Sequence, residues 1–461
     1  MTQYAVTNPA TGEVEKTFPT ATDDQVRTAI EVAHRAFSDW RQSDVAARAA
    51  LLNRVADLYA ERREALAEII AREMGKPLFQ GGIEIDIVVS IYRYYAEQGP
   101  SLLADEPLSP SSGGSAVIRK QGLGVLLGIM PWNFPYYQVA RFVAPNLMLG
   151  NTILLKHAPQ CPESAAAMEQ IFRDAGAAEG LYVNLYASNE QAATVIADSR
   201  VQGVSLTGSE RAGAAVAEIA GRNLKKVVLE LGGADPFIVL EDADLELAVQ
   251  QALIGRFANA GQACNAAKRI LVDRRLHDDF LDAFQQAVES IAVGAPQDDA
   301  TFMGPLSSES ALETLEAQVQ DAVAQGARVV TGGRRLDRPG AWYEPTLLTD
   351  VTPEMRLFHE ELFGPVAVVY PVDGEEEAVR LANDSAYGLG AVIHSRDIER
   401  AQRLAVRLEA GMVHINEGPG SAAELPFGGV KRSGFGRELG PDGMGEFVNR
   451  KLVKLASGTK S

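Results

Sequence analysis

The chain has 461 residues, of which 46% are hydrophobic, and it contains 42 glycines. This length exceeds what one hydrophobic core organises, and the composition is typical of a folded α/β protein rather than of a disordered or fibrous chain. The 43 Lys and Arg residues and the 61 Asp and Glu residues give a net charge of −18, which disfavours nucleic acid and anionic membranes as partners.

The sequence carries no sign of export or of membrane insertion. It has two cysteines, Cys161 and Cys264, and its first residues lack the basic segment and apolar core of a secretory signal. No apolar run approaches the roughly 18 residues that span a bilayer. We therefore expect a cytoplasmic protein with reduced thiols, and a disulfide between the two cysteines is the less favoured alternative.

The N-terminal part is predicted to be helical, with apolar residues at helical spacing over residues 23–37 and 45–74. The stretch 103–121 is rich in Ser and Gly and is predicted to form a projecting hairpin. The terminal sequence 450–455 has the character of a strand. We expect these two segments to form a contact between copies of the chain.

After residue 122 the pattern changes to alternating strands and helices. Strands are predicted at 125–130, 152–156, 204–207 and 226–230, and helices at 163–173 and from Gly208 to about Ala220. A second series begins near Asp235, with helices at 242–259, 277–290 and 309–325 and strands at 269–272 and 411–415. The two series predict an α/β fold of two doubly wound domains that meet at a cleft.

Cys264 is the candidate nucleophile. It lies in the polar, small-residue sequence 261–266, where a substrate and a cofactor can approach the backbone closely. A thiol is strongly nucleophilic even when only a few per cent is ionised. The alternative is a buried structural cysteine, which is our interpretation of Cys161.

Glu230 is the candidate general base. It ends an apolar strand and is followed by two glycines. Desolvation beside an apolar strand raises the pKa of a carboxyl group, as a general base requires. A salt-bridged glutamate at a strand end is the alternative.

Two prolines, Pro131 and Pro135, enclose Asn133 in a rigid turn. Such rigidity is expected if the Asn133 amide must point an N–H donor at a charge that develops during a reaction. A tight hydrophobic turn is the alternative.

The sequence 207–213 follows a strand and opens a helix, so its free N–H groups are suited to a pyrophosphate, although a simple helix cap explains it equally well. Lys156, at the end of another strand, is a candidate to reach a ribose or a phosphate. The six histidines are scattered, and we predict no metal site.

Taken in order, these motifs resemble the aldehyde dehydrogenase superfamily over essentially the whole chain. The resemblance is carried by the runs 8–13, 131–135, 207–213, 230–233, 261–264, 360–365 and 426–438. It implies a cofactor-binding domain formed by residues 1–103 and 122–232, with 433–447 packing back on it. It further implies a catalytic domain over 233–432 and an oligomerisation element over 104–121 and 448–461, and hence a homodimer or homotetramer.

The resemblance also implies roles for individual residues. Cys264 would attack an aldehyde carbonyl, the Asn133 amide and the Cys264 N–H would hold the oxyanion, and Glu230 would activate the water that hydrolyses the thioester. Relatives that acylate CoA or form acyl phosphates lack this base. The matching cofactor-binding positions, with Phe363 beside the nicotinamide, are Trp132, Asn133, Lys156, Pro159, Gly208, Ser209, Gly213, Leu231, Glu361 and Phe363.

Within the superfamily the sequence is most similar to bacterial succinate-semialdehyde dehydrogenases. Their substrate carries a carboxylate, so the resemblance implies an arginine at the far end of the pocket. Arg141 matches such a position in relatives, Arg256 is a second candidate two places off, and Ser421 would add a hydroxyl donor. Glutarate semialdehyde, one methylene longer, and plain aliphatic aldehydes remain alternatives. A non-catalytic binding protein on this fold is the alternative from another class.

Two positions depart from the pattern of relatives. Many NAD-selective relatives carry a glutamate three residues after Lys156, where it repels a 2′-phosphate, but here that residue is Pro159, with His157 nearby. We therefore expect NADP to be accepted and preferred, with NAD as the alternative cofactor. The second position is Ala266, where some relatives carry a second cysteine, so that no local disulfide switch is expected.

Overall fold

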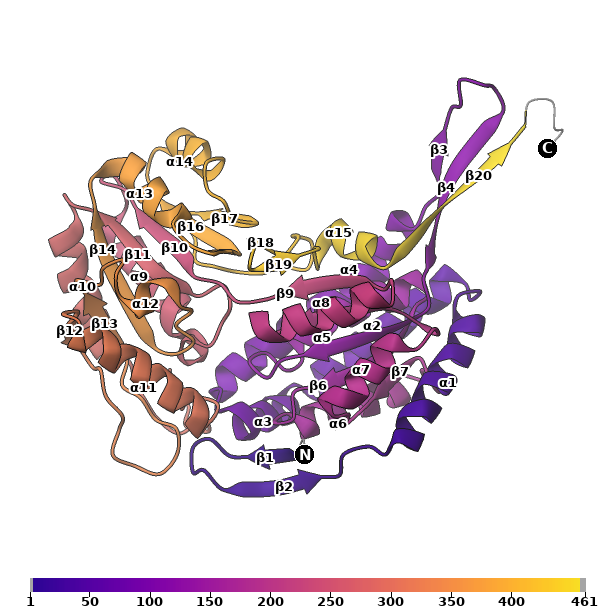
Figure 1. The fold of residues 1–461 in the computed structure, drawn as a ribbon, viewed down its shortest axis with the longest axis horizontal. Coiled ribbons are helices and arrows are strands. Elements are labelled where there is room, and N and C mark those ends of the chain that lie inside the picture. Colours follow the sequence, from indigo (N-terminus) through magenta and orange to yellow (C-terminus); the bar gives the residue numbers. More distant parts are fainter. Residues whose placement is uncertain (1–2, 457–461) are drawn as a thin grey trace.

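The computed structural model describes residues 3–456, and two open parallel sheets organise most of it (Figure 1). The first sheet has six strands in the order β19-β9-β8-β5-β6-β7, all parallel except β19. Its strands are β5 (Val125–Met130), β6 (Thr152–His157), β7 (Tyr182–Asn184), β8 (Val201–Thr207), β9 (Lys226–Glu230) and β19 (Gly434–Phe435).

Both faces of this sheet are covered by helices, and its side chains alternate between two cores. Leu126 and Ile153 pack with one set of helices, whereas Leu127 and Leu154 pack with the other. The first set is α2 (Val45–Glu61), α3 (Arg63–Met74), α4 (Leu78–Leu102), α5 (Tyr137–Leu149), α6 (Pro162–Asp174) and α15 (Gly440–Glu446). The second set is α1 (Asp23–Trp40), α7 (Asn189–Ala197) and α8 (Glu210–Arg222).

The strand order reverses direction between β5 and β8. The chain runs outward from β5 through β6 to β7, then returns to place β8 on the other side of β5. In open α/β sheets, ligands bind beyond the carboxyl ends of the strands at this reversal. The segments that follow β5 and β8 therefore occupy the expected ligand-binding edge.

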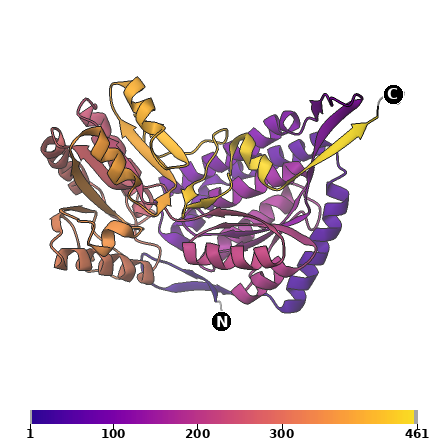
Figure 2. The ribbon, with the colours of Figure 1, turned by 45° about the horizontal axis from the view of Figure 1, so that its top comes forward.

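The second sheet has seven strands in the order β12-β13-β14-β11-β10-β16-β17, and only β12 runs antiparallel within it. Its strands are β10 (Asp235–Val239), β11 (Ala267–Asp273), β12 (Arg328–Thr331), β13 (Thr346–Thr349), β14 (Val366–Val372), β16 (Gly390–His394) and β17 (Met412–Ile415). The helices of this domain are α9 (Leu245–Phe257), the 3₁₀ turn η1 (Ala258–Gly261), α10 (His277–Glu289), α11 (Glu309–Ala324), α12 (Arg356–His359), α13 (Gly374–Asn383) and α14 (Ile398–Ala405). Figure 2 shows the two sheets in separate halves of the molecule.

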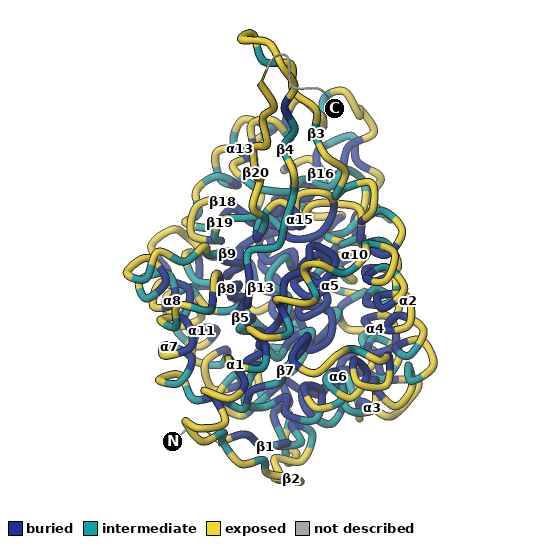
Figure 3. Tube along the Cα trace, turned by 90° about the vertical axis from the view of Figure 1, so that its right-hand side faces the viewer, coloured by how far each residue is buried: buried dark blue, intermediate teal, exposed yellow. Residues whose placement is uncertain are grey.

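Three small sheets complete the fold. The strands β1 (Tyr4–Thr7) and β2 (Val14–Phe18) form a hairpin, and β15 (Tyr387–Gly388) pairs with β18 (Val430–Lys431). The third sheet consists of β3 (Glu106–Leu108), β4 (Ser115–Gly122) and the C-terminal strand β20 (Val448–Leu455). It projects as an arm whose surface is largely exposed (Figure 3).

The predicted α/β class is confirmed, and two strands, β5 and β9, match their predicted bounds. The stretch 45–74, predicted as continuously helical, is two helices that meet at Arg62. Seven helices of the described chain were not predicted: α4, α5, α7, α12, α13, α14 and α15. Every residue of α5 is buried, so the sequence lacks the polar face that makes a helix recognisable. Within residues 3–456, no helix combines the length and the apolar character needed to cross a membrane.

Candidate active site

The candidate nucleophile lies on a strained loop between α9 and β11. Asn259, Ala260 and Gly261 take φ angles of 54°, 52° and 71°, three left-handed residues in succession. Each non-glycine residue in this region costs roughly 1–2 kcal/mol. The loop that presents Cys264 must therefore be held by contacts from its surroundings.

Arg256 supplies several of these contacts and, although the sequence made it a candidate substrate residue, it does not line the cavity that contains Cys264. Its guanidinium is fully buried and donates to the backbone carbonyls of Val366 at 2.7 Å, Leu362 at 3.0 Å and Gly364. It also approaches the Gly261 carbonyl at 3.4 Å. Because these carbonyls occupy its donors, Arg256 ties the nucleophile loop to the segment before β14.

A cavity of about 300 Å³ begins at Cys264. Arg141 and Ser421, both predicted substrate residues, line it together with Tyr137 and Phe427. The Ser421 hydroxyl lies 2.5 Å from the Tyr137 hydroxyl, and Arg141 Nη1 donates to that same phenol at 3.4 Å. The structure therefore gathers one cation and two hydroxyl groups in the cavity that contains the thiol.

Arg141 is fully buried and faces a carboxylate as well as the cavity. Its Nε lies 2.7 Å from Glu438 Oε2, and the guanidinium packs 4.2 Å from the centre of the Phe427 ring. Burial lowers the pKa of Arg141, but Glu438, Tyr137, Glu230 and Cys264 together more than offset this, so the pKa is raised and the guanidinium stays charged. Among the described residues, Arg141 Nη2 has no hydrogen-bond partner.

Glu230 is almost fully buried at the end of β9, and neither carboxyl oxygen has a hydrogen-bond partner within residues 3–456. Burial raises its pKa well above the ordinary value, Arg141 lowers it and Glu438 raises it further. A Cβ added to Gly428 would lie 2.7 Å from Glu230 Oε1, so the base needs a glycine beside it. These surroundings suit a carboxyl group that accepts a proton as a general base.

The loop leaves part of Cys264 exposed to the cavity, yet its enclosed position raises the pKa of the thiol to about 12. Arg141 and Lys268 lower this pKa, whereas Glu361 and Asp235 raise it. The same arginine acts on Glu230. The field of one buried guanidinium thus reaches both the candidate nucleophile and the candidate base.

The structure brings Asn133 to the nucleophile loop. Asn133 Nδ2 donates at 3.0 Å to the carbonyl of Gln262, two residues before Cys264. The Asn133 carbonyl accepts from Asn259 Nδ2 at 2.9 Å and from Lys76 Nζ at 2.9 Å. The turn between β5 and α5 is therefore joined to the nucleophile loop through both the side chain and the backbone carbonyl of Asn133.

A buried ion pair between Lys76 and Glu84 contacts this turn. Lys76 Nζ lies 2.5 Å from Glu84 Oε2 and 3.7 Å from the centre of the Phe134 ring. Glu84 Oε1 accepts from the N–H groups of Tyr136 and Tyr137 at 2.9 and 3.1 Å, where α5 begins. The pair thereby fixes the start of the helix that carries Arg141.

The predicted cofactor residues surround the edge where the sheet order reverses. Gly208 donates to the Glu230 carbonyl at 2.9 Å, and Ser209 caps α8 by accepting from the Ala212 N–H. Thr207 Oγ1 is buried there without a hydrogen-bond partner among the described residues. The α8 N-terminus and the buried cation Lys156, whose pKa is lowered by burial, fit the pyrophosphate of a dinucleotide.

The other predicted cofactor residues line the same region. Trp132 and Phe363 pack edge to face, with ring centres 5.6 Å apart. Gly213 lies against Leu231, since an added Cβ would meet the leucine side chain at 2.6 Å. Glu361 Oε1 accepts from the Gly233 N–H at 3.1 Å.

Two further sequence expectations can be compared with the structure. The ring of His157 is buried, and its Nε2 lies 2.9 Å from the Pro135 carbonyl, so it faces the interior and does not reach the cofactor edge. The backbone carbonyl of Pro159, two residues after His157, accepts from the Ala5 N–H at 3.1 Å. Cys161 and Cys264 are both free, so the structure contains no disulfide between them.

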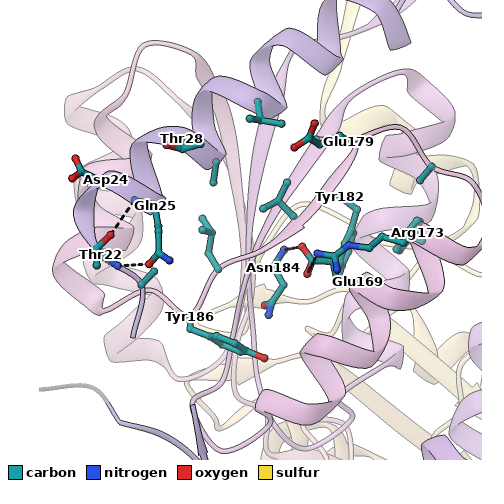
Figure 4. Close-up of a pocket in the computed structure, with 18 of the residues that line it drawn as sticks. Thr22, Asp24, Gln25, Thr28, Glu169, Arg173, Glu179, Tyr182, Asn184 and Tyr186 are labelled. Carbon is teal, nitrogen blue, oxygen red and sulfur yellow. Dashed lines mark hydrogen bonds and ion pairs between the residues drawn. The ribbon is translucent and has the colours of Figure 1, made fainter. Parts of the chain in front are cut away.

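A larger cavity, of about 740 Å³, lies on the outer side of the first domain (Figure 4). It is lined by Gln25 at the start of α1, Glu169 on α6 and Tyr186 in the segment after β7, among other residues. None of the predicted catalytic, substrate or cofactor residues lines it. The chemistry therefore centres on the smaller cavity.

Sequence reasoning missed several residues of the site. Tyr137 lies four positions before Arg141, a spacing that places both on one face of a helix once α5 is recognised. Glu438 lies within a motif that supported the resemblance, but no local pattern pairs it with Arg141. Lys76 and Glu84 belong to α4 and its approach, which were not predicted.

Two doubly wound sheets and a cavity that ends at a cysteine define a two-domain α/β enzyme. Residues 1–453 match the aldehyde dehydrogenase family, and the chain belongs to that family.

Several similar proteins are named as succinate-semialdehyde dehydrogenases. The chain is 55% identical to the NADP(+) succinate-semialdehyde dehydrogenase of Deinococcus radiodurans, covering 98% of this chain and 94% of the relative. It is 45% identical to the NAD(P)+ succinate semialdehyde dehydrogenase Sad of Escherichia coli, covering 97% and 96%. A solved structure, the succinic semialdehyde dehydrogenase of Streptococcus pyogenes with NADP+, superposes with a TM-score of 0.97 at 42% identity, covering 98% and 100%.

Proposed function

We propose that this aldehyde dehydrogenase oxidises succinate semialdehyde to succinate and prefers NADP to NAD as the oxidant. The observation that carries the proposal is the cavity that joins the Cys264 thiol to the buried, permanently charged Arg141. A guanidinium with a free Nη2 is suited to a carboxylate, and the Ser421 and Tyr137 hydroxyls add donors. The names of the relatives support the same substrate and cofactor.

The reaction begins when Cys264, as the thiolate, bonds to the aldehyde carbon. The Asn133 amide and the Cys264 N–H then donate to the oxygen, which becomes negatively charged. The α8 N-terminus and Lys156 would hold a nicotinamide dinucleotide, whose chemistry would be to accept the hydride that leaves the thiohemiacetal carbon, so that a thioester to Cys264 remains. Glu230 takes a proton from water as the water oxygen attacks the thioester carbon, and the Cys264 thiolate leaves.

We further propose the domain boundaries and the assembly that the resemblance implies. Residues 1–103, 122–232 and 433–447 would form the cofactor-binding domain, and 233–432 the catalytic domain. The arm of β3, β4 and β20 exposes Leu108, Leu452 and Leu455, which supports a contact between copies of the chain. A monomeric molar mass in light scattering would refute this assembly.

The proposal predicts a loss of charge selectivity when Arg141 is replaced. We would compare succinate semialdehyde with butanal, which has the same number of carbons, in wild type and in the double variant Arg141→Met/Glu438→Gln. The second change avoids leaving a buried carboxylate unpaired. We expect kcat/KM for the semialdehyde to fall on the order of 10²-fold, with a much smaller loss for butanal, because truncating one partner of a buried charge pair costs about 2–5 kcal/mol.

These experiments distinguish the role of Arg141 from that of Cys264. Equal losses on the two aldehydes would exclude Arg141 as the carboxylate site, and a Cys264→Ser variant that still turns over would exclude the nucleophile. Glutarate semialdehyde belongs in the same panel, because one methylene changes binding by only about 1–3 kcal/mol. Running the panel with both cofactors tests the preference, and a hundredfold advantage for NAD would contradict it.

A further inference from the structure

Lys268, the second residue of β11, is buried behind the nucleophile. Its side chain is 2% exposed, and its Nζ donates to the carbonyls of Ala263 at 2.9 Å and Cys264 at 2.6 Å. The third contact is an ion pair with Glu361, at 3.3 Å from Oε1. One ammonium group therefore joins two successive carbonyls of the nucleophile loop to a carboxylate on another segment.

The bond to Ala263 fixes the orientation of the donor that follows it. The Ala263 carbonyl and the Cys264 N–H belong to one peptide unit, which is planar and trans, so the two groups point in opposite directions. Holding the carbonyl against Lys268 turns the Cys264 N–H away from the ammonium. The same carbonyl also accepts from the Ala266 N–H at 3.2 Å, which closes a tight turn around the cysteine.

The Cys264 carbonyl also lies close to the backbone of Gly233. A Cβ added to Gly233 would lie 2.5 Å from that oxygen, so the backbone approaches it closely. The Gly233 N–H in turn donates to Glu361 Oε1 at 3.1 Å, and the same oxygen faces Lys268. Lys268, Cys264, Gly233 and Glu361 thus form a closed ring of contacts.

We propose that Lys268 is a positioning residue that orients the Cys264 N–H as an oxyanion donor and couples the nucleophile loop to Glu361. The inference rests on the proposed function for the roles of Cys264 and Glu361. This positioning role explains why the Lys268 side chain is buried behind Cys264. Without it, the strained loop would lose the contacts that set the plane of the 263–264 peptide.

Lys268→Met is the test, because methionine keeps the length and apolar stem of lysine but lacks the ammonium. We expect kcat for succinate semialdehyde with NADP to fall at least tenfold with little change in KM. Removal of one complete oxyanion donor costs about 10²–10³-fold, and a misdirected donor costs part of that. Lys268→Arg, which restores the charge and the N–H donors, should recover part of the rate.

A second readout follows the thiol directly and needs no aldehyde. The charges that act on Cys264 are Arg141 from α5, Lys268 from β11, Asp235 from β10 and Glu361 from the loop after α12. Since Lys268→Met removes a cation, the pH midpoint of iodoacetamide alkylation should move upward. Cys264→Ser gives the blank, because Cys161 is fully buried.

Lys225→Met is the matched control. Lys225 Nζ also donates to two backbone carbonyls, those of Asp198 at 2.9 Å and Val201 at 2.6 Å, but it lies outside the site. This variant should lose comparable thermal stability and keep the wild-type kcat and alkylation midpoint. If Lys268→Met does not fold, kcat and the pH midpoint of alkylation are measured on Lys268→Gln instead.

Wild-type kcat and midpoint in Lys268→Met would overturn the proposal, and so would equal changes in the Lys225 control. If the wild-type enzyme turned over no semialdehyde, the proposed substrate would fail, while the alkylation shift would still decide the role of Lys268.

Discussion

Arg141 is the side chain that connects the substrate cavity with the buried carboxyl groups. It lines the cavity beside Cys264 and forms an ion pair with Glu438 at 2.7 Å. Its charge also lowers the pKa of Glu230. A substrate carboxylate at Arg141 would therefore enter a field already shared with two acidic groups, and the balance among them sets the proton affinity of the base.

Glu230 has a predictable effect on stability. Burial raises its pKa in the folded state above the value of about 4.3 in the unfolded chain. Between these two values the folded state binds more protons, so the free energy of unfolding falls as pH rises through that window. We expect Glu230→Gln to be more stable than wild type at pH 8, with a difference that shrinks toward pH 4.

Thermal unfolding of the two proteins across this pH range measures the difference. The same raised pKa predicts that thioester hydrolysis accelerates with pH in wild type, because water is activated only by the ionised carboxylate. A stability difference that grows as pH falls would show that Glu230 is stabilised as the anion, contrary to its surroundings.

At the scale of elements, the return of the chain to the first sheet positions the base. Strand β19 pairs antiparallel with β9, with Gly434 opposite Glu230, and the Leu231 N–H donates to the Ser433 carbonyl at 2.9 Å. Gly434 has φ of 116°. The base is thus held by a strand that is more than two hundred residues away in sequence.

Gly434→Ala tests this pairing. An added Cβ would lie 2.0 Å from the Leu229 carbonyl, a contact that the backbone must move to relieve. We expect a loss of roughly 1–3 kcal/mol in the free energy of unfolding, together with a lower kcat.

Gly445→Ala, in the same C-terminal segment, is the control, since an added Cβ would meet nothing within 4 Å. Chemical denaturation with parallel rate measurements distinguishes the two variants. If Gly434→Ala were as stable and as active as Gly445→Ala, the β9–β19 pairing would not position Glu230.

The sequence predicted the elements whose patterns are local. The runs that became β5 and β9 are short, apolar and bounded by proline, glycine or charge, so their limits were recognisable. Glu230 was identified as the polar end of β9, and Asn133 was identified from the two prolines that enclose it after β5. The fully buried α5 was missed because it has no polar face. In α4 the polar stripe of Asp86, Ser90, Arg93 and Glu97 was overlooked, and the glycines at 81 and 82 weaken the helical pattern of its first turns.

Contacts between segments that are distant in sequence could not be predicted from local sequence patterns. Arg256 was a substrate candidate because it lies two places from an arginine position of some relatives, but in the structure its guanidinium donates to backbone carbonyls. Glu438 and Lys268 gain their roles only when β19 returns to the first sheet and β11 passes behind the nucleophile.

At the scale of the whole molecule, the two sheets contribute different parts of one site. The first sheet carries Asn133, Glu230 and, on α5, Arg141, whereas Cys264 precedes β11 of the second sheet. Contacts such as Asn133 to Gln262 hold the parts together. The proposed chemistry therefore depends on a thiol from one domain and a carboxyl group from the other acting on the same carbon.

The most direct test of this dependence uses Glu230→Gln, which keeps the thiol and removes the base. We would mix this variant with succinate semialdehyde and NADP, quench it, and map the acyl group by peptide mass spectrometry. We predict one equivalent of NADPH formed rapidly, with the acyl group on Cys264 and little further turnover. Steady turnover at the wild-type rate, or NADPH formation with no adduct on Cys264, would contradict the two-domain mechanism.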